Sequence, residues 1–521
     1  MTPSLTQLLQ DLEFQYDARS ARTLWVPRVR SVRLEASRTH CTVVETSADA
    51  SRPEKHRLEL LWQDVLGAHI LTEDGEHLAL PIGLESVSKS KTYVFVLFAF
   101  PAKNHSPGSL KRRVLRQWLF RFQGDKMTDM VELLTWLNYL ADPRSQEAIA
   151  LAPSLEELKP VTHPTRKYLV IINPVGGAGK GVQMFEKHVA PIFKYTHVEA
   201  QVQLTERANH GTDIAEQLPL GQYDGVITVG GDGSLCEIFQ GLMKRPDWKD
   251  AIKVPIGVIP GGSGNGLFAS VMHGLGERFK PANAAFVIAK GLPQPLDLAS
   301  VRNPHGDQMY SFLSTEWALI GDADIESEKL RMLGGLRFTV MIAHHVLLLR
   351  RMYGGRIWYL EDDPNNTSAV VPHNADEGSE RPGFDLFENL EEGALASDGS
   401  GARWRKIEGP FQLSWAMNTS HAAPDCHTAP GAGLNDGYTY LVVLHQKHSR
   451  KDLIDLMLAI DKGTHTKVEA MDFIRTRAYR MEPENPDDVF CVDGELFKGP
   501  VESQVHHNVA RIVSLPPTQS A

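Results

Sequence analysis

The sequence predicts an α/β domain built on a parallel sheet, followed by an antiparallel β-sandwich and preceded by a β-rich region. From Lys167 onward strands alternate with helices, which is typical of parallel strand–helix–strand units. Beyond Leu296 the alternation fades into strands with few helices. The first part of the chain has several candidate strands and a single helix. We therefore expect three domains, at 1–155, 165–295 and 296–516.

Composition places the chain among ordinary globular proteins. The 521 residues are 42% hydrophobic, enough for several cores. A net charge of −10 argues against a nucleic-acid-binding protein. Between Glu361 and Gly401 eleven acids face one base, so this segment alone accounts for the net charge. Because it also lacks periodicity, we expect a disordered acidic insertion at 361–403.

Cysteine usage and apolar runs predict a water-soluble, cytoplasmic protein. The four cysteines are scattered without CxxC spacing, which favours a reducing compartment. The longest apolar run, Tyr93 to Ala102, is too short to span a bilayer, and the N-terminus lacks a signal-peptide pattern. One group of metal-capable side chains fits no zinc spacing, so we expect local loop contacts there: His421, Asp425, Cys426 and His427.

The N-terminal region has the composition of several strands closed by one helix. Apolar positions from Val131 to Ala141 form one side of that helix. This order suits a pleckstrin-homology-like module. Basic residues interleave with apolar and aromatic ones in a strip that either meets anionic lipid or forms a charged strand face without a ligand. Its basic members are Lys111, Arg112, Arg113, Arg116 and Arg121.

The stretch from Tyr223 to Met243 carries the strongest chemical signal. The β-branched run Val226 to Val229 ends in Gly-Gly-Asp-Gly, and apolar residues then recur at helical spacing. Glycines let the backbone approach a ligand, and the following helix start offers free N–H groups to an anion. A carboxylate such as that of Asp232 beside a phosphate could take a proton from an attacking hydroxyl. The ordinary alternative is a β-turn with a solvated Asp.

Two further glycine loops follow predicted strands. The loop 173–181 comes after the strand Tyr168 to Ile172, and the loop 260–266 comes after Val254 to Ile259. The first is not a Walker P-loop, because Pro174 and Gly181 occupy positions that require Gly and Ser or Thr. Open α/β sheets bind ligands at the carboxyl ends of their strands. We therefore expect the three glycine corners to converge on one crevice that holds phosphate.

The motifs together resemble those of a known family. In order they are NPVGGAGKG, GGDGSLCEIFQGLMKRPDW, IPGGSGNGLFAS, WALIGDADIESEKLRMLGGLRFT and VDGE. Over about Tyr168 to Pro516 the chain resembles the sphingosine kinases, which are sphingoid long-chain-base kinases of the diacylglycerol-kinase-like superfamily. The resemblance implies an ATP-binding α/β domain, a lipid-binding β-sandwich, and Mg²⁺-dependent transfer of phosphate from ATP to the primary hydroxyl of a sphingoid base.

The resemblance also implies roles for particular residues. Asp232 matches the general base. Positions around the nucleotide are matched by Asn173, Gly177, Thr205, Gly231, Gly233, Ser263, Glu328, Arg331, Arg337 and Asp493. Asp493 and Glu237 match carboxylates near the metal, acting through waters. Alternatives from the residues themselves are surface pairing of the two arginines with nearby glutamates, and a hairpin cap at Asp493.

Asp324 matches the position that recognises the substrate head group. A sphingoid base carries an ammonium near its reactive hydroxyl, which a second carboxylate would orient, whereas diacylglycerol and ceramide lack this cation. Apolar residues from Phe338 to Met352 fit an acyl-chain pocket or an ordinary buried helix. With Arg337, Arg350 and Arg351 at its ends, the stretch also resembles a calmodulin target.

Other functions remain open at this level. The rivals are a ceramide or diacylglycerol kinase, an NAD kinase, and a catalytically inactive lipid-binding protein. Val175 stands where many members of the family have a basic residue, so one phosphate contact is either absent or supplied by Lys180. An enzyme that acts on a lipid must meet the membrane, so peripheral association is expected.

Overall fold

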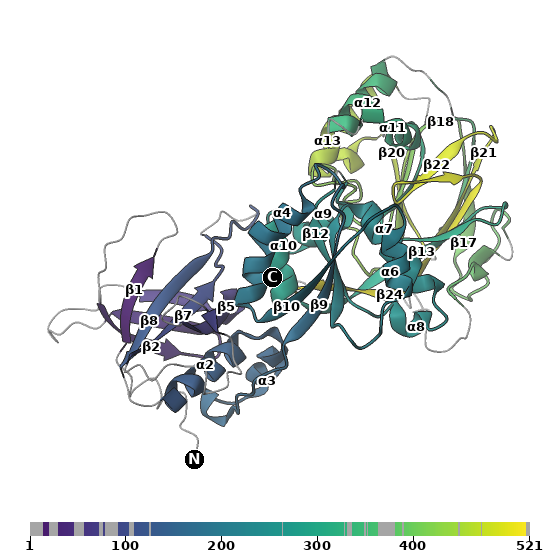
Figure 1. The fold of residues 1–521 in the computed structure, drawn as a ribbon. Helices are drawn as coiled ribbons and strands as arrows, with labels where there is room; N and C mark the ends of the chain where they lie inside the picture. The colour runs from purple at the N-terminus through teal and green to yellow at the C-terminus, as the bar shows by residue number, and fades with distance from the viewer. Residues whose placement is uncertain are drawn as a thin grey trace.

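The computed structural model describes residues 14–19, 30–45, 57–71, 77–78, 92–103, 109–123, 127–262, 264–327, 329–330, 336–347, 351, 353–362, 381–387, 390–445, 449–469 and 471–516. Three parts follow one another: an N-terminal sheet at one end, a parallel sheet in the middle, and a C-terminal part at the other end (Figure 1). Within these ranges, no helix is both long and apolar enough to cross a bilayer.

The N-terminal part is an eight-stranded antiparallel sheet in the order β4-β3-β2-β1-β8-β7-β5-β6. Helix α2 (Met127–Ala141) packs Leu133, Leu134 and Leu137 into the same apolar core as Phe95 and Phe120. The strands are β1 (Phe14–Arg19), β2 (Arg30–Ala36), β3 (His40–Glu45), β4 (Arg57–Leu61), β5 (Val65–Leu71), β6 (His77–Leu78), β7 (Thr92–Ala99) and β8 (Arg116–Gln123). The turn η1 (Trp62–Asp64) joins β4 to β5, and three short helical segments after α2 lead on to the next domain: η3 (Pro143–Ser145), α3 (Gln146–Leu151) and η4 (Leu155–Glu157).

The middle part contains the predicted parallel sheet. Strands β10, β9, β11 and β12 lie side by side and parallel, so this prediction is confirmed. The β-branched residues of β11 are buried on both faces, as expected for a strand covered by helices. The elements are β9 (Arg166–Ile172), α4 (Gly181–Met184), η5 (Phe185–Val189), α5 (Ala190–Tyr195), β10 (Val198–Leu204), α6 (His210–Glu216), β11 (Gly225–Gly230), α7 (Asp232–Lys244), α8 (Trp248–Ala251), β12 (Ile256–Pro260), α9 (Gly266–Gly274) and α10 (Pro281–Lys290).

One long C-terminal strand, β24 (Val501–Ser514), connects the middle and C-terminal parts. Near its end Ile512 pairs in parallel with Ile256 of β12, whereas near its start Gln504 pairs antiparallel with Ala478 of β21 (Ala478–Pro483). Strand β13 (Leu292–Arg302) runs antiparallel along most of its length. The sheet is therefore continuous across the domain boundary expected between residues 295 and 296.

The C-terminal part adds a second, six-stranded sheet in the order β20-β19-β18-β15-β22-β23. An apolar cluster contains side chains of both sheets, among them Trp317, Phe411 and Phe490 of the six-stranded sheet and Ile357 and Met481 of the larger one. The elements are β14 (Gln308–Ser311), β15 (Ser314–Ala318), α11 (Leu319–Ser327), α12 (Leu336–Leu347), β16 (Gly355–Glu361), η7 (Asp385–Phe387), β17 (Arg403–Glu408), β18 (Phe411–Met417), β19 (Thr439–His445), α13 (Arg450–Ala459), η8 (Ile460–Lys462), η9 (His465–Lys467), β20 (Met471–Thr476), β22 (Val489–Val492) and β23 (Glu495–Lys498).

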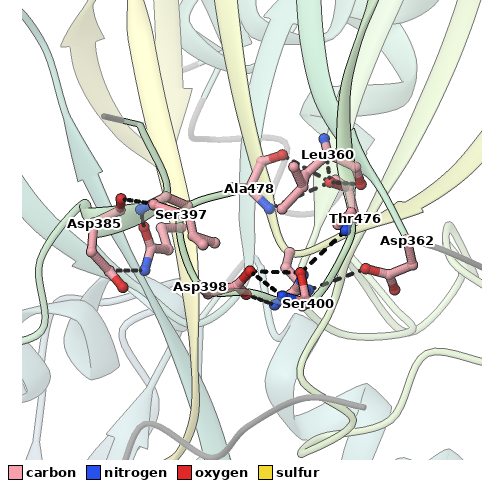
Figure 2. Close-up of polar contacts among 12 residues, drawn as sticks. Leu360, Asp362, Asp385, Ser397, Asp398, Ser400, Thr476 and Ala478 are labelled. Atoms are coloured by element: carbon pink, nitrogen blue, oxygen red, sulfur yellow. Dashed lines mark hydrogen bonds and ion pairs between the residues drawn. The ribbon is translucent and has the colours of Figure 1, made fainter. Parts of the chain in front are cut away.

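Part of the acidic segment is folded, so the expectation of disorder throughout 361–403 is wrong for residues 381–387 and 390–403. Their apolar side chains, including Leu386 and Phe387, pack with Trp404 in a small core. The Arg477 guanidinium donates to Asp398 at 2.5 Å and to Asp362 at 3.1 Å, and Figure 2 shows both acids beside the strand that carries Thr476. Asp362 and Asp398 are thus paired with the buried Arg477, a partner that the spacing of residues in the sequence could not reveal. Residues 363–380 lie outside the described residues.

A buried ionic network holds the N-terminal part against the middle part. Arg113 donates to Asp64 at 2.6 Å and to the fully buried Glu277 at 2.8 Å. The ammonium of Lys290, on α10, donates to main-chain carbonyls of the N-terminal part, among them that of Val65 at 2.8 Å, and burial lowers the pKa of Lys290 to about 7. Lys111 likewise donates to the Leu275 carbonyl at 3.0 Å. Two members of the basic strip therefore bind the neighbouring domain, and are not available to meet lipid.

Replacing Arg113 should destabilise this junction strongly. Removing one partner of a buried ion pair typically costs about 3–5 kcal/mol. Without Arg113, the buried Glu277 would keep, among the described residues, only the Asn283 amide at 2.9 Å and the more distant Lys111 ammonium at 3.8 Å. We expect Arg113→Ala to lower the unfolding midpoint in a thermal scan, with the N-terminal part becoming protease-sensitive first. The exposed neighbour Arg112 provides the matched control, since Arg112→Ala should change stability by no more than about 0.5 kcal/mol. Equal midpoints for the two variants would contradict the role given to Arg113.

Candidate active site

The three glycine corners converge, as the sequence predicted. They follow the adjacent parallel strands β9, β11 and β12 at one edge of the sheet. Gly177 has φ +57°, and a Cβ built there would lie 2.5 Å from the Gly261 carbonyl oxygen. A Cβ on Gly262 would lie 2.3 Å from the Gly231 Cα. Because such distances exclude any side chain, the loops contact one another directly through their backbones.

Asp232 is the first residue of α7 and lies at this meeting point. Its carboxylate accepts hydrogen bonds from the Gly266 N–H at 2.8 Å and the Leu267 N–H at 3.4 Å, in the first turn of α9. Burial raises the pKa of Asp232 to about 7, against the effect of these amides, and the Asp493 carboxylate adds to the rise. A carboxylate with a pKa near neutrality is suited to accept a proton at physiological pH.

Asp493 has a different environment in the turn between β22 and β23. Its carboxylate accepts from the Ser311 hydroxyl at 2.7 Å and from the main-chain N–H groups of Phe312, Leu313 and Ser314 at 2.9, 3.0 and 2.9 Å. Its backbone has φ +51°, and its side chain is 1% exposed. Burial raises its pKa to about 6. This geometry makes Asp493 a brace that ties the β22–β23 turn to the chain between β14 and β15.

Glu237 braces a helix start while keeping access to solvent. From α7 it accepts the N–H groups of Asn209 at 2.9 Å and Gly211 at 2.8 Å, one on each carboxylate oxygen, at the N-terminus of α6. A carboxylate has about four acceptor positions. Glu237 therefore keeps two of them and is half-buried, whereas Asp493 has four donors and is enclosed.

Other predicted nucleotide contacts lie around the same corner. The Asn173 Oδ1 accepts from the Val175 N–H at 3.1 Å and shapes the first glycine loop, while the Thr205 N–H donates to the Ile172 carbonyl at 2.9 Å. Gly233, in α7, faces the β22–β23 turn, since a Cβ there would lie 4.0 Å from Glu495 Oε1. Ser263, Glu328 and Arg331 lie outside the described residues. Arg337 is on α12, buried, with its guanidinium 4.5 Å from the Phe338 ring centre, so its predicted nucleotide contact stays a prediction.

A second acidic site adjoins this corner along β22. Asp324, on α11, accepts from the Cys491 thiol at 2.8 Å. Cys491 lies in β22, two residues before Asp493 in the turn that follows this strand. The neighbouring Asp322 is instead neutralised, since its carboxylate accepts from Arg351 at 2.8 Å and from the Tyr353 hydroxyl at 2.6 Å. The two acids of the Asp-Ala-Asp sequence therefore differ: Asp322 is held by Arg351 and Tyr353, whereas Asp324 borders the site.

Sequence reasoning missed Glu316, which joins Asp324. It lies on β15 and is buried, its Oε1 accepts from the Ser314 hydroxyl at 3.1 Å, and its carboxylate lies within 4.8 Å of the Asp324 carboxylate and the Cys491 thiol. Burial raises its pKa well above the usual range, and the Asp324 charge raises it further. The available signal was a lone acid within the predicted strand Tyr310 to Ile320.

The sequence is similar to proteins of a known family. Residues 167–301 match the family model of the diacylglycerol kinase catalytic domain. The chain is 33% identical to sphingosine kinase 1 of Homo sapiens over 357 residues, 67% of this chain and 91% of that protein. It is 32% identical to sphingosine kinase 2 of Arabidopsis thaliana over 343 residues, 63% of this chain and 68% of that one.

A yeast protein is a further relative in sequence. The chain is 30% identical to sphingoid long chain base kinase 4 of Schizosaccharomyces pombe over 346 residues, covering 64% of this chain and 71% of that one. A crystal structure of a diacylglycerol kinase from Bacillus anthracis aligns with 68% of this chain and 99% of that one, at 16% identity and a TM-score of 0.46. On the identity and coverage of its sequence relatives, the chain belongs to the sphingosine kinase family.

Proposed function

We propose that the protein is an ATP-dependent lipid kinase that phosphorylates the primary hydroxyl of sphingoid bases, namely sphingosine, dihydrosphingosine and phytosphingosine. The observation that carries the proposal is the buried Asp232 at the point where three glycine corners meet. Backbone amides of the glycine loops would hold the phosphates of ATP. Asp232 would accept the hydroxyl proton while the γ-phosphoryl group transfers.

The residues present fit a magnesium ion held mainly by the nucleotide. When bound, Mg²⁺ would supply charge neutralisation across the β- and γ-phosphates. Glu237 has free acceptor positions and solvent access, so it fits an outer position reached through metal-bound water. The acceptor positions of the Asp493 carboxylate are occupied by four donors. We therefore assign Asp493 the structural role of bracing the β22–β23 turn and only an indirect influence on the nucleotide.

We also propose that the C-terminal part is the predicted lipid-binding β-sandwich and that residues 1–155 form the pleckstrin-homology-like module. The apolar cluster shared by two sheets supports the first, and an antiparallel sheet followed by α2 supports the second. Peripheral membrane contact remains part of the proposal because the substrate is a lipid. Calmodulin binding is not favoured, because Arg351 is held in ion pairs with Asp322 and Asp488.

The substrate class is tested with a panel of lipids and [γ-³²P]ATP. We expect the purified protein to phosphorylate the three free-amine sphingoid bases and to leave ceramide and diacylglycerol unmodified. Asp324→Asn should raise KM for sphingosine by about 10–100-fold, because a charge-assisted hydrogen bond to the ammonium contributes roughly 1.5–3 kcal/mol. The matched control is Asp250→Asn, on the exposed face of α8. Transfer of labelled phosphate to ceramide but not to sphingosine would contradict this proposal and favour a ceramide kinase.

The role of the base is tested by Asp232→Asn. The amide oxygen can still accept the Gly266 N–H, so the fold should persist, but the group cannot take a proton. We expect kcat to fall by about 10²–10⁴-fold with ATP affinity nearly unchanged, measured by steady-state kinetics and nucleotide titration. Turnover within threefold of the wild type would remove Asp232 from this role.

The raised pKa of Asp232 predicts the pH dependence. With a pKa of about 7, the carboxylate becomes increasingly protonated, and therefore inactive as a base, as pH falls below that value. We expect kcat/KM to drop about tenfold per pH unit between pH 6.5 and 5. Circular dichroism at each pH separates loss of the base from unfolding. A profile that stays flat down to pH 5 with the fold intact would contradict a base of this pKa.

A further inference from the structure

A cluster of three histidines lies outside the kinase site, where the middle and C-terminal parts meet. His273 is near the C-terminus of α9, and His421 and His427 lie in the segment after β18. One possible ligand atom from each histidine lies within 4.8 Å of the other two. The ring centres of His421 and His427 are 4.2 Å apart. The His273 ring centre lies 4.6 Å from that of His421 and 4.7 Å from that of His427. The sequence motif alone showed only the two later histidines.

The surroundings hold these rings in place. The His421 main-chain N–H donates to the Ser270 hydroxyl of α9 at 3.0 Å, and Ser420 Oγ lies 2.9 Å from His421 Nδ1. His421 is 3% exposed, whereas His273 is exposed to solvent. Gly463 has φ +64°, and a Cβ there would lie 2.7 Å from His427 Nδ1, so a glycine leaves the space that this ring uses. The cluster is therefore built from α9, the segment after β18 and the turn after η8.

The chemistry of the cluster suits a late first-row divalent cation. Each of the three imidazoles offers one ring nitrogen to a common point, as a shared metal ion would require. Neutral imidazoles are the ligands that zinc prefers, at about 2.0–2.1 Å, whereas Mg²⁺ requires oxygen ligands. Two nitrogens on one tetrahedral zinc lie roughly 3.4 Å apart. Because the His421 and His427 rings are stacked with planes 7° apart, one of the two rings must turn out of the stack when both bind the same ion.

We propose that His273, His421 and His427 form a binding site for one Zn²⁺ ion that fastens α9 to the segment after β18. The Ser420 hydroxyl binds Nδ1 of His421 and so directs its other ring nitrogen toward the metal. The fourth position is open to water. The site is separate from the Mg²⁺–ATP chemistry, because its ligands are imidazoles and its members are not among the residues assigned to the kinase reaction.

The test is a direct metal titration of tag-free, chelator-treated full-length protein, without ATP or Mg²⁺. Zinc is titrated in competition with a chromophoric chelator, and bound zinc is counted by elemental analysis after gel filtration. We expect one tightly bound zinc per chain and a zinc-dependent rise in Tm. His273→Asn, at an exposed position, should weaken zinc binding by at least about tenfold and abolish the rise in Tm.

Two further variants make the result specific. His427→Asn should behave like His273→Asn, while His188→Asn, an exposed histidine on η5, should bind zinc as the wild type does. Circular dichroism confirms that each variant is folded. Unchanged zinc affinity and stoichiometry in both cluster variants, or no tight zinc in the wild type, would overturn the proposal. Because the readout is bound metal, either result is independent of the kinase assignment.

Discussion

Backbone-to-backbone contact between glycine loops is the constraint on which the site depends. The corners after β9, β11 and β12 can share one small volume only because their contacting residues lack side chains. A Cβ on Gly231 would lie 2.9 Å from the Gly264 carbonyl oxygen, and one on Gly262 would lie closer still to Gly231. The close approach brings the N-termini of α7 and α9 to the same point. A polyanion entering there would meet N–H groups and two positive helix ends.

Three carboxylates near this point show how environment divides roles among similar side chains. Asp232 accepts two amide bonds, is buried, and has a pKa raised to about 7. Asp493 is equally enclosed but has four donors, which oppose the effect of burial and leave its pKa at about 6. Glu237 accepts two amides at the start of α6 and remains open to solvent. Of these three carboxylates, only that of Asp232 both lies where the glycine loops meet and has a pKa suited to proton transfer.

Short sequence patterns correctly predicted those features of the fold that depend on residues close together in the chain. Strand–turn–helix units around Gly177, Gly231 and Gly262 were sufficient to predict a parallel sheet and a shared crevice, because parallel strands end at one edge. The shared strand β24 could not be predicted in this way, since Ile512 pairs with Ile256 across half the chain. The folded part of the acidic segment was missed for the same reason.

The residues missed in the sites were likewise those whose partners are distant. Glu316 is recognised as part of a cluster only because Asp324 and Cys491 lie beside it, and these residues come from a helix and another strand. His273 lies 148 residues before His421 in the chain, so no spacing rule connects them. The charge of an acid or the ring of a histidine is visible in the sequence, but its burial and its neighbours arise only from the packing of separate elements.

Helix α9 brings these separate features into one element. Its first N–H groups hold the Asp232 carboxylate, its Ser270 hydroxyl accepts the His421 N–H, and His273 lies near its end. A Cβ on Gly266 would lie 2.7 Å from the His421 carbonyl oxygen, so the helix start and the segment after β18 are also in direct contact. A displacement of that segment relative to the middle part would therefore disturb its contacts with α9. Because the same helix positions the amides that bind Asp232, the environment of the proposed base depends on how the C-terminal part is seated.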